Sequence, residues 1–143
     1  MDKKSLIHEI KIINGDIFKA ISNRYKRMNI DITPMHARII MTIYKSSEPL
    51  CQKDLESSMS CNKSTMSSII STMEKNGLLV RQTCKQDSRI NYLVLTDKGL
   101  EMVDFLKKDR KHNEKILMDG ISDDEYLVFT QVVDKIRNNL ERI

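Results

Sequence analysis

Apolar residues recur at intervals of three and four near both ends of the chain, which is the spacing of one face of an α-helix. The first stripe is Ile10, Ile13, Ile17, Ile21 and Tyr25. It predicts a helix over roughly residues 4–27. The second stripe, Tyr126, Phe129, Val133, Ile136, Leu140 and Ile143, predicts a terminal helix. Each helix must bury its stripe, and on amphipathicity alone an intramolecular bundle and a dimer fit equally well.

Residues with strong capping preferences divide the middle of the chain into shorter helices. Thr33 is a good N-cap for a helix with Pro34 at its first position. Asn62 is a good N-cap for a later helix, which should stop at Gly77 because glycine readily takes the left-handed conformation of a helix C-terminus. A short helix over Cys51–Met59 fits between these two. The pattern therefore predicts three helices between residues 33 and 77.

Two apolar runs rich in aliphatic residues follow at Leu78–Thr83 and Ile90–Leu95, and the polar stretch Cys84–Arg89 separates them. This pattern predicts a β-hairpin with a charged tip. Thr96 then caps a fifth helix that runs to about residue 118, and Ser122 caps a sixth. The predicted fold class is mainly α (α+β), with one hairpin.

The fourth predicted helix combines a packing face with a polar face. A methionine-rich stripe at helical spacing is typical of core packing, and the predicted core is Leu55, Met59, Met66, Ile69, Ile70 and Met73. Small hydroxyl side chains dominate the other face, although they are poorer helix formers than Glu or Lys. That face is Lys63, Ser64, Thr65, Ser67, Ser68, Ser71 and Thr72. Short helix, tight turn, polar helix and hairpin together form a winged helix-turn-helix, which presents its polar helix to the DNA major groove.

Composition agrees with this interpretation. The 143 residues suffice for one domain with its own core, and the formal net charge is +4. Residues 1–32 and 33–99 each carry +3, and residues 100–143 carry −2, so the basic excess lies where DNA contact is expected. Ordinary solvated surfaces would explain charges this small almost as well. The chain lacks a run of about 18 apolar residues or a signal-peptide pattern, which predicts a cytoplasmic protein with no membrane partner.

Enzyme motifs are missing from the sequence. It contains no Gly-rich phosphate loop, nucleophile elbow or paired His–carboxylate motif. We therefore expect a protein that is not an enzyme.

Five segments resemble the MarR family of bacterial transcription regulators, and together they extend over nearly the whole chain. They are Ile32-Thr33-Pro34, Leu55 through Ser67, Met73 through Arg81, Asp87-Ser88-Arg89 and Leu95-Thr96-Asp97-Lys98-Gly99. The fourth is similar to the wing signature of that family, and the fifth to the segment that follows the wing. These two, at their spacing after Gly77-Leu78, are the most specific.

The resemblance implies a homodimer joined by its first and last helices. It makes residues 1–143 a single MarR-like domain, with dimerisation helices at about 1–32 and 100–143 and a DNA-binding lobe at about 33–99. It also implies binding to a palindrome in double-stranded DNA, with each fourth helix in a major groove and each wing at a flanking minor groove. The expected function is a transcriptional regulator, a repressor, that a small ligand or an oxidant releases from its operator.

By the family pattern, Arg89 would be the arginine that enters the minor groove, and Asp87 would orient its guanidinium. The alternative interpretation is a surface ion pair at a solvated hairpin tip, without a role in DNA binding. Ser68 stands where many relatives carry a basic residue, which leaves the base contacts open. The expected DNA-binding residues are Asn62, Lys63, Ser64, Thr65, Ser67, Ser68, Thr72, Lys85, Asp87, Ser88 and Arg89.

His36 stands where glutamine is frequent in the family, beside a hinge at which relatives tend to bind small aromatic or anionic ligands. His36 and Arg38 are therefore the candidate effector-binding residues. A lone histidine on a helix is more often structural than ligand-binding.

The three cysteines are odd in number and contain no CxxC pair, so a disulfide scaffold and a zinc cluster both fit poorly. The histidines fall on three separate predicted elements, and we expect no metal and no cofactor. Cys61, beside the start of the fourth helix, and Cys84, at the base of the hairpin, are candidate redox sensors. Two alternatives thus remain: a thiol-based redox sensor of the same fold, and a winged-helix protein-interaction module without operator binding.

Overall fold

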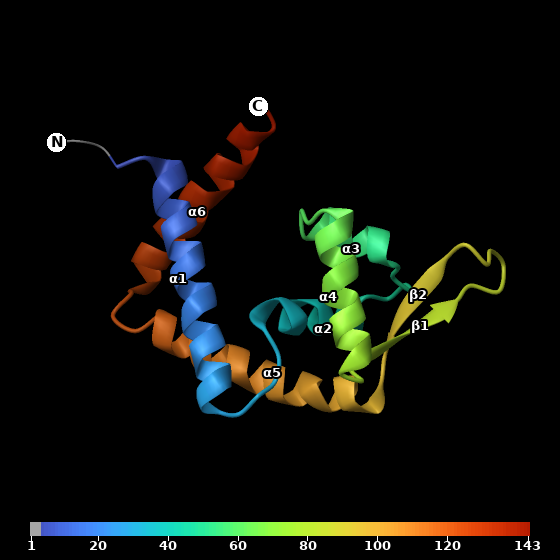
Figure 1. Ribbon diagram of the computed structural model, residues 1–143. Helices are drawn as coiled ribbons and strands as arrows, with labels where there is room; N and C mark the ends of the chain where they lie inside the picture. The colour runs from blue at the N-terminus through green and yellow to red at the C-terminus, as the bar shows by residue number, and fades with distance from the viewer. Residues whose placement is uncertain (1–3) are drawn as a thin grey trace. The chain divides into compact units, whose positions relative to one another are not determined.

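The computed structural model describes residues 4–143, and within that range it contains six helices and one two-stranded sheet (Figure 1). In chain order they are α1 (Leu6–Arg27), α2 (Pro34–Lys45), α3 (Gln52–Ser58), α4 (Lys63–Lys75), β1 (Leu79–Thr83), β2 (Asn91–Leu95), α5 (Asp97–Leu117) and α6 (Asp123–Leu140). The mainly helical fold with one hairpin is as predicted. Residues 1–3 of the first predicted dimerisation segment lie outside the described residues.

The predicted capping residues start the helices. The side-chain oxygen of Thr33 accepts a hydrogen bond from the His36 amide at 3.1 Å, and that of Asn62 accepts one from the Thr65 amide at 2.8 Å. Ser122 caps α6 in the same way. Small differences occur at the ends: Cys51 and Met59 flank α3 instead of belonging to it, each strand begins one residue later than predicted, and α5 ends at residue 117.

The chain divides into two compact units, Met1–Leu106 and Lys107–Ile143. The first unit holds the core, which draws on α2, α3, α4 and the hairpin. Its fully buried large side chains are Ile39, Ile40, Leu55, Met66, Ile70, Met73, Leu78 and Leu79. Of the predicted core set, only Ile69 is half-buried, and it packs against the rest. From α1 only Tyr25 is buried, and its ring packs against Phe105 at 6.1 Å between centroids.

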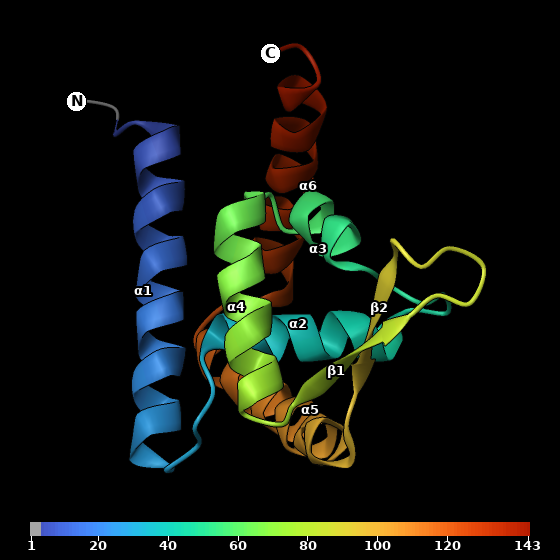
Figure 2. The same cartoon turned by 45° about the vertical axis from the view of Figure 1, so that its right-hand side comes forward.

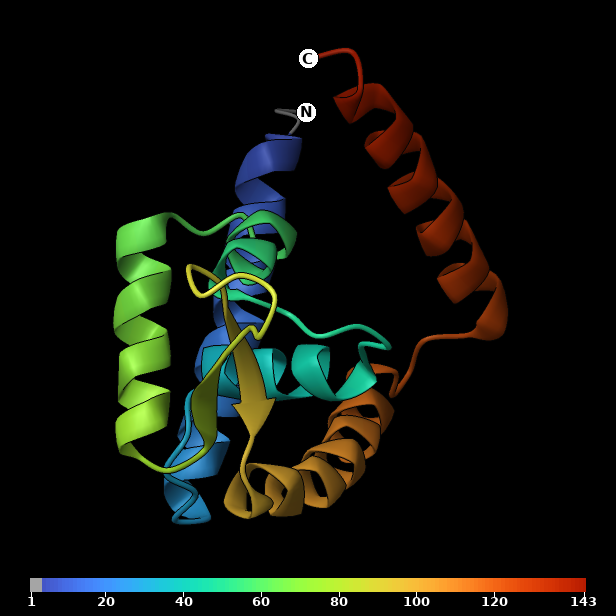
Figure 3. The same ribbon diagram turned by 90° about the vertical axis from the view of Figure 1, so that its right-hand side faces the viewer.

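The hairpin is antiparallel, and its register pairs Leu79 with Leu95 and Thr83 with Asn91. One face of it contributes Leu79 and Leu93 to the core. The amide of Leu93 donates a hydrogen bond to the Leu50 carbonyl at 2.8 Å, so the segment before α3 is attached to β2. Figure 3 shows the hairpin beside α4, and Figure 1 shows its tip extending away from the helices of this unit.

The second unit contains the end of α5 and all of α6. In α6 no residue is buried, although the helix carries large apolar side chains along its length. Within α5, the Asn113 amide group donates a hydrogen bond to the Asp109 carboxylate at 2.9 Å. Among residues 4–143, no helix has the length and the apolar character needed to cross a membrane.

Candidate nucleic-acid interface

The polar face of α4 is exposed as predicted, except that Ser67 is half-buried. The side-chain oxygen of Asn62 caps the helix, as predicted, and its contact with DNA stays a prediction. The hydroxyl of Thr72 donates to the Ser68 carbonyl one turn earlier at 3.1 Å. Lys63, Ser64 and Thr65 occupy the first turn, where the amide groups and the helix dipole favour a negatively charged partner. This turn is therefore suited to a DNA phosphate and the adjacent base edges.

The hairpin tip carries a two-pronged ion pair. The Arg89 guanidinium donates from Nε to Asp87 Oδ1 and from a terminal nitrogen to Oδ2, both at 3.0 Å. These hydrogen bonds lower the pKa of Asp87 and raise that of Arg89. The arginine side chain is 88% exposed, so the pair adds little to stability. Its effect is geometric: it limits the directions in which the guanidinium can extend from the tip.

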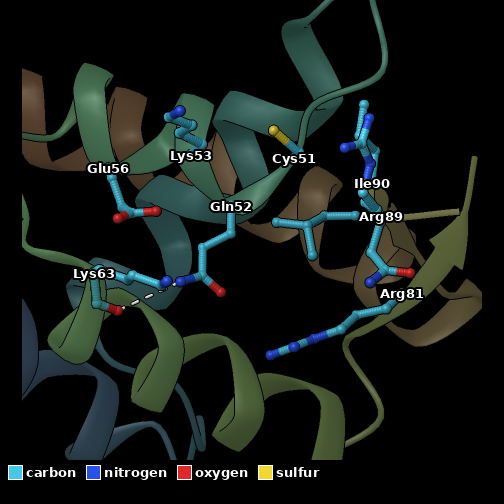
Figure 4. Close-up of a pocket in the computed structure, with 10 residues that line it drawn as sticks. Cys51, Gln52, Lys53, Glu56, Lys63, Arg81, Arg89 and Ile90 are labelled. Carbon is cyan, nitrogen blue, oxygen red and sulfur yellow. Dashed lines mark hydrogen bonds between the residues drawn. The ribbon is translucent and has the colours of Figure 1, made fainter. Parts of the chain in front are cut away.

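Between α3, the start of α4 and the hairpin lies a groove of about 420 Å³ (Figure 4). Four cations line it, one each from α3, α4, β1 and the hairpin tip, together with a single anion, Glu56. The cations are Lys53, Lys63, Arg81 and Arg89. A groove with this excess of positive charge attracts phosphate. The groove thus connects the first turn of α4, through Lys63, with the hairpin tip.

The groove residues that were missing from the sequence prediction include Gln52, Lys53, Arg81 and Asn91. Arg81 is the most informative of them, because it reaches from β1 toward α4 (Figure 4). Its backbone amide donates to the Glu74 carboxylate at 3.3 Å, and its guanidinium donates to the Ser71 hydroxyl at 3.4 Å. The alternation of side chains along a strand could have placed Arg81 on the same face as Leu79.

His36 and Arg38 do not form a shared site within α2. His36 is buried, and its Nδ1 accepts a hydrogen bond from the Thr33 amide at 3.3 Å, whereas Arg38 is exposed. Burial lowers the pKa of His36, and nearby Asp31 opposes that shift. Because Nδ1 accepts the Thr33 amide, this hydrogen bond favours the tautomer with its proton on Nε2. Neither residue lines the cationic groove, and their effector role stays a prediction.

The two candidate thiols differ in their surroundings. Cys61 is half-buried, whereas Cys84 is buried at the base of the hairpin tip. Hydrogen bonds from the amides of Asp87 and Gln86, and from the Tyr92 hydroxyl, lower the pKa of Cys84. Within residues 4–143, the histidine, cysteine and carboxylate side chains form no cluster that could hold a metal ion.

Comparison with known proteins gives a consistent set of matches. The sequence model of the MarR family matches residues 32–90. The uncharacterized HTH-type transcriptional regulator YdgJ of Bacillus subtilis (strain 168) is 24% identical over 73% of this chain. That alignment spans 63% of YdgJ, slightly less than two thirds of its length.

Two solved structures share the whole architecture. MepR of S. aureus, in complex with DNA, matches with a TM-score of 0.85 at 18% identity, over 96% of this chain and 99% of MepR. FabT of Streptococcus pneumoniae, also in complex with DNA, matches with a TM-score of 0.79 at 19% identity, over 96% of each chain. These likenesses confirm the predicted winged-helix fold with added N- and C-terminal helices.

Proposed function

Because this chain belongs to the MarR family of winged helix-turn-helix transcriptional regulators, we propose that it is a homodimeric repressor that binds a palindromic operator. One observation carries the proposal: Lys63, in the first turn of α4, and Arg89, at the hairpin tip, line the same cationic groove. MepR and FabT, whose folds match this one, were solved in complex with DNA. Members of this family are not enzymes.

Each part of the interface has a separate task in this proposal. Thr65, Ser67 and Ser68 read base edges in the major groove. Arg89, oriented by Asp87, enters the minor groove of a flanking segment, where narrow A·T-rich DNA concentrates negative potential. The remaining predicted residues, Asn62, Lys63, Ser64, Thr72, Lys85 and Ser88, position the protein on the phosphates. Arg81 and Lys53 join that phosphate-contacting group because they line the groove.

The proposed dimer uses the terminal helices. Along α1 the side chains of Leu6, Ile7, Ile10 and Ile13 are exposed, and along α6 so are those of Phe129, Val132 and Leu140. Exposed apolar stripes of this length mark protein interfaces. We therefore propose one MarR-like domain, in which about 1–32 and 100–143 hold two copies together and about 33–99 binds DNA.

Release from DNA is the regulatory part of the proposal. A small aromatic or anionic effector would act near His36 and Arg38.

For an oxidant, Cys84 is the better candidate of the two thiols, because hydrogen bonds stabilise its thiolate. Peroxide should then release DNA from the wild type and leave the Cys84→Ser variant bound, and equal release from both would exclude a Cys84 sensor. We also propose that the regulator acts in the cytoplasm.

The main test combines light scattering with DNA binding. The protein should have a mass near twice 16.7 kDa, and in a fluorescence-anisotropy titration it should prefer a duplex from the promoter of its own gene over a scrambled duplex. Both titrations are run at two salt concentrations, because phosphate contacts weaken as salt rises. A monomer of 16.7 kDa would refute the dimer. A stable dimer without any preference for a DNA sequence would favour the protein-interaction module.

A further inference from the structure

The C-terminal end of α4 has an ordered backbone turn. Gly77, at φ +74°, follows the helix, and the Leu78 amide donates back to the Met73 carbonyl at 3.0 Å. The Gly77 amide donates to the Glu74 carbonyl at 3.0 Å, which completes a Schellman motif. These two amides satisfy the carbonyls of Met73 and Glu74 in the last turn of the helix. The carbonyl oxygens of residues 76–78 are left to find partners elsewhere.

The junction between β2 and α5 supplies a donor for each of these three carbonyls. Lys98 Nζ donates to the Asn76 carbonyl at 2.8 Å, and Thr96 Oγ1 donates to the Gly77 carbonyl at 2.5 Å. The Thr96 amide donates to the Leu78 carbonyl at 3.2 Å. Figures 1 and 2 both show β2 entering α5 next to the turn that ends α4. We call these three hydrogen bonds the α4 clamp.

Two further contacts tighten the clamp. Thr96 Oγ1 accepts a hydrogen bond from the Gly99 amide at 3.1 Å, so one hydroxyl caps α5 and also holds the end of α4. Gly99 itself packs directly on the Leu78 carbonyl, which a Cβ at that position would overlap. Gly15, in the middle of α1, has open space around its Cα by comparison. The close approach explains why glycine is needed at residue 99.

Apolar packing does not by itself set the orientation of α4. Met66, Ile70 and Met73 are completely buried beneath the helix, but hydrophobic contacts have no preferred direction. Hydrogen bonds prefer defined distances and angles, and the clamp places three of them at one end of the helix. Base recognition needs side chains held to within about 0.5 Å.

We propose that Thr96 and Lys98 are positioning residues for DNA recognition. They hold α4 so that its polar face meets the base edges, and they make no DNA contact themselves. The Lys98 ammonium donates to the Asn76 carbonyl, at the negative end of the α4 dipole. This inference rests on the proposed DNA-binding function.

The test measures sequence discrimination and not affinity alone. A duplex is first isolated from a randomised library with the wild-type protein, and a scrambled duplex of equal length is the reference. Dissociation constants for both are measured by anisotropy at several salt concentrations for Lys98→Met. Lys75→Met is the matched control, because Lys75 is an exposed cation in the last turn of α4. Its side chain makes no hydrogen bond or ion pair within the described residues.

We expect Lys98→Met to weaken binding of the selected duplex about threefold to tenfold, the effect of one lost hydrogen bond. Binding of the scrambled duplex and the salt dependence should stay as in the wild type. Lys75→Met should leave the ratio of the two constants unchanged. The proposal is wrong if Lys98→Met weakens both duplexes equally and reduces the salt slope by about 0.9, because that result marks a direct phosphate contact. Unchanged binding of both duplexes would refute it as well.

A second pair of variants separates the role of the Thr96 hydroxyl in positioning α4 from a general loss of stability. Thr96→Val removes the hydroxyl at nearly equal volume, and Thr96→Ser retains it. Both are compared at a temperature at which circular dichroism shows each to be folded. Thr96→Val should lose discrimination and Thr96→Ser should keep it, whereas equal discrimination by both would refute the role of the hydroxyl. If the wild type selects no sequence from the library, the proposed operator binding is itself refuted. That outcome differs from a result that refutes only the role of the α4 clamp.

Discussion

Helices α4 and α6 are both capped and amphipathic, yet they differ completely in what covers their apolar faces. In α4, Met66, Ile70 and Met73 are each 0% exposed beneath the hairpin and α3. In α6 nothing is buried, and Phe129 is 61% exposed. The comparison shows that an apolar stripe predicts burial of one helix face. It does not identify the part of the protein that covers that face. The core beneath α4 is formed within one chain, whereas the apolar stripe of α6 stays exposed.

Helix α1 behaves like α6 over most of its length. Its only buried residue is Tyr25, near its C-terminus, whereas Ile7 is 67% exposed. The two helices are the first and last elements in chain order, and in the proposed dimer their stripes meet a second copy without altering the lobe core. On this comparison, substitutions in the stripes should affect assembly, and those in the lobe should affect folding or DNA contact.

The largest expected effect comes from placing charge on the α6 stripe. Ile136→Glu with Leu140→Glu should reduce the mass measured by light scattering from about twice 16.7 kDa to 16.7 kDa, because buried carboxylates repel across a dimer interface. Operator binding should be lost with the dimer, because each half of the palindrome would then be bound by a separate monomer. The control, Gln131→Glu with Asn138→Glu, adds the same charge on the opposite face. An intact dimer in the first variant would contradict the comparison.

The next effect concerns stability. Ile70→Ala should lower the free energy of unfolding by about 2–5 kcal/mol, because it leaves a cavity in a fully buried site. Phe129→Ala should lower it only through weaker association, so its effect should disappear on dilution. Urea denaturation at two protein concentrations separates the two cases. A loss for Phe129→Ala that is independent of concentration would show that α6 is part of a single-chain core.

Within the lobe, two exposed residues should separate affinity from specificity. Thr65→Ala should shrink the gap between operator and scrambled DNA by roughly 1–3 kcal/mol, if it removes a base contact. Arg89→Ala should weaken both DNAs and reduce the salt slope by about 0.9, and Asp87→Ala should act similarly but more mildly. Anisotropy titrations measure all three, and light scattering should still give a dimer. Wild-type operator binding by Arg89→Ala would refute the wing assignment.

The smallest expected effect is a pH dependence from His36. Burial lowers its pKa, so the unfolded chain takes up a proton more readily than the folded one. Its stabilising contribution is complete above the unfolded-state pKa of 6.5 and is lost as the pH falls toward the lower folded-state value. A protonated ring also cannot accept the Thr33 amide.

The measurement is urea unfolding between about pH 7.5 and about pH 5. The stability of the wild type relative to His36→Gln should decrease across that range. His112→Gln, at an exposed position in α5, should keep the wild-type pH dependence. A constant difference between wild type and His36→Gln would mean that His36 does not titrate differently on folding.

The sequence alone determined the features that depend on near neighbours. Thr33, Asn62 and Ser122 were predictable caps, because a cap acts on an amide three residues away. The hairpin, the stop at Gly77 and nearly all of the lobe core followed from spacing in the same way. The ion pair of Asp87 with Arg89 spans only two residues, which is why a short motif could indicate it.

The tertiary structure decided everything that joins distant positions. It placed Arg81 against Glu74 and Ser71, it separated buried His36 from exposed Arg38, and it brought Lys98 to the Asn76 carbonyl, 22 residues away. No local pattern encodes such contacts, because each depends on how the helices pack around the shared core. The same reason explains why two similar stripes ended so differently. Periodicity specifies which face of a helix is apolar, and only packing specifies whether the chain itself can cover it.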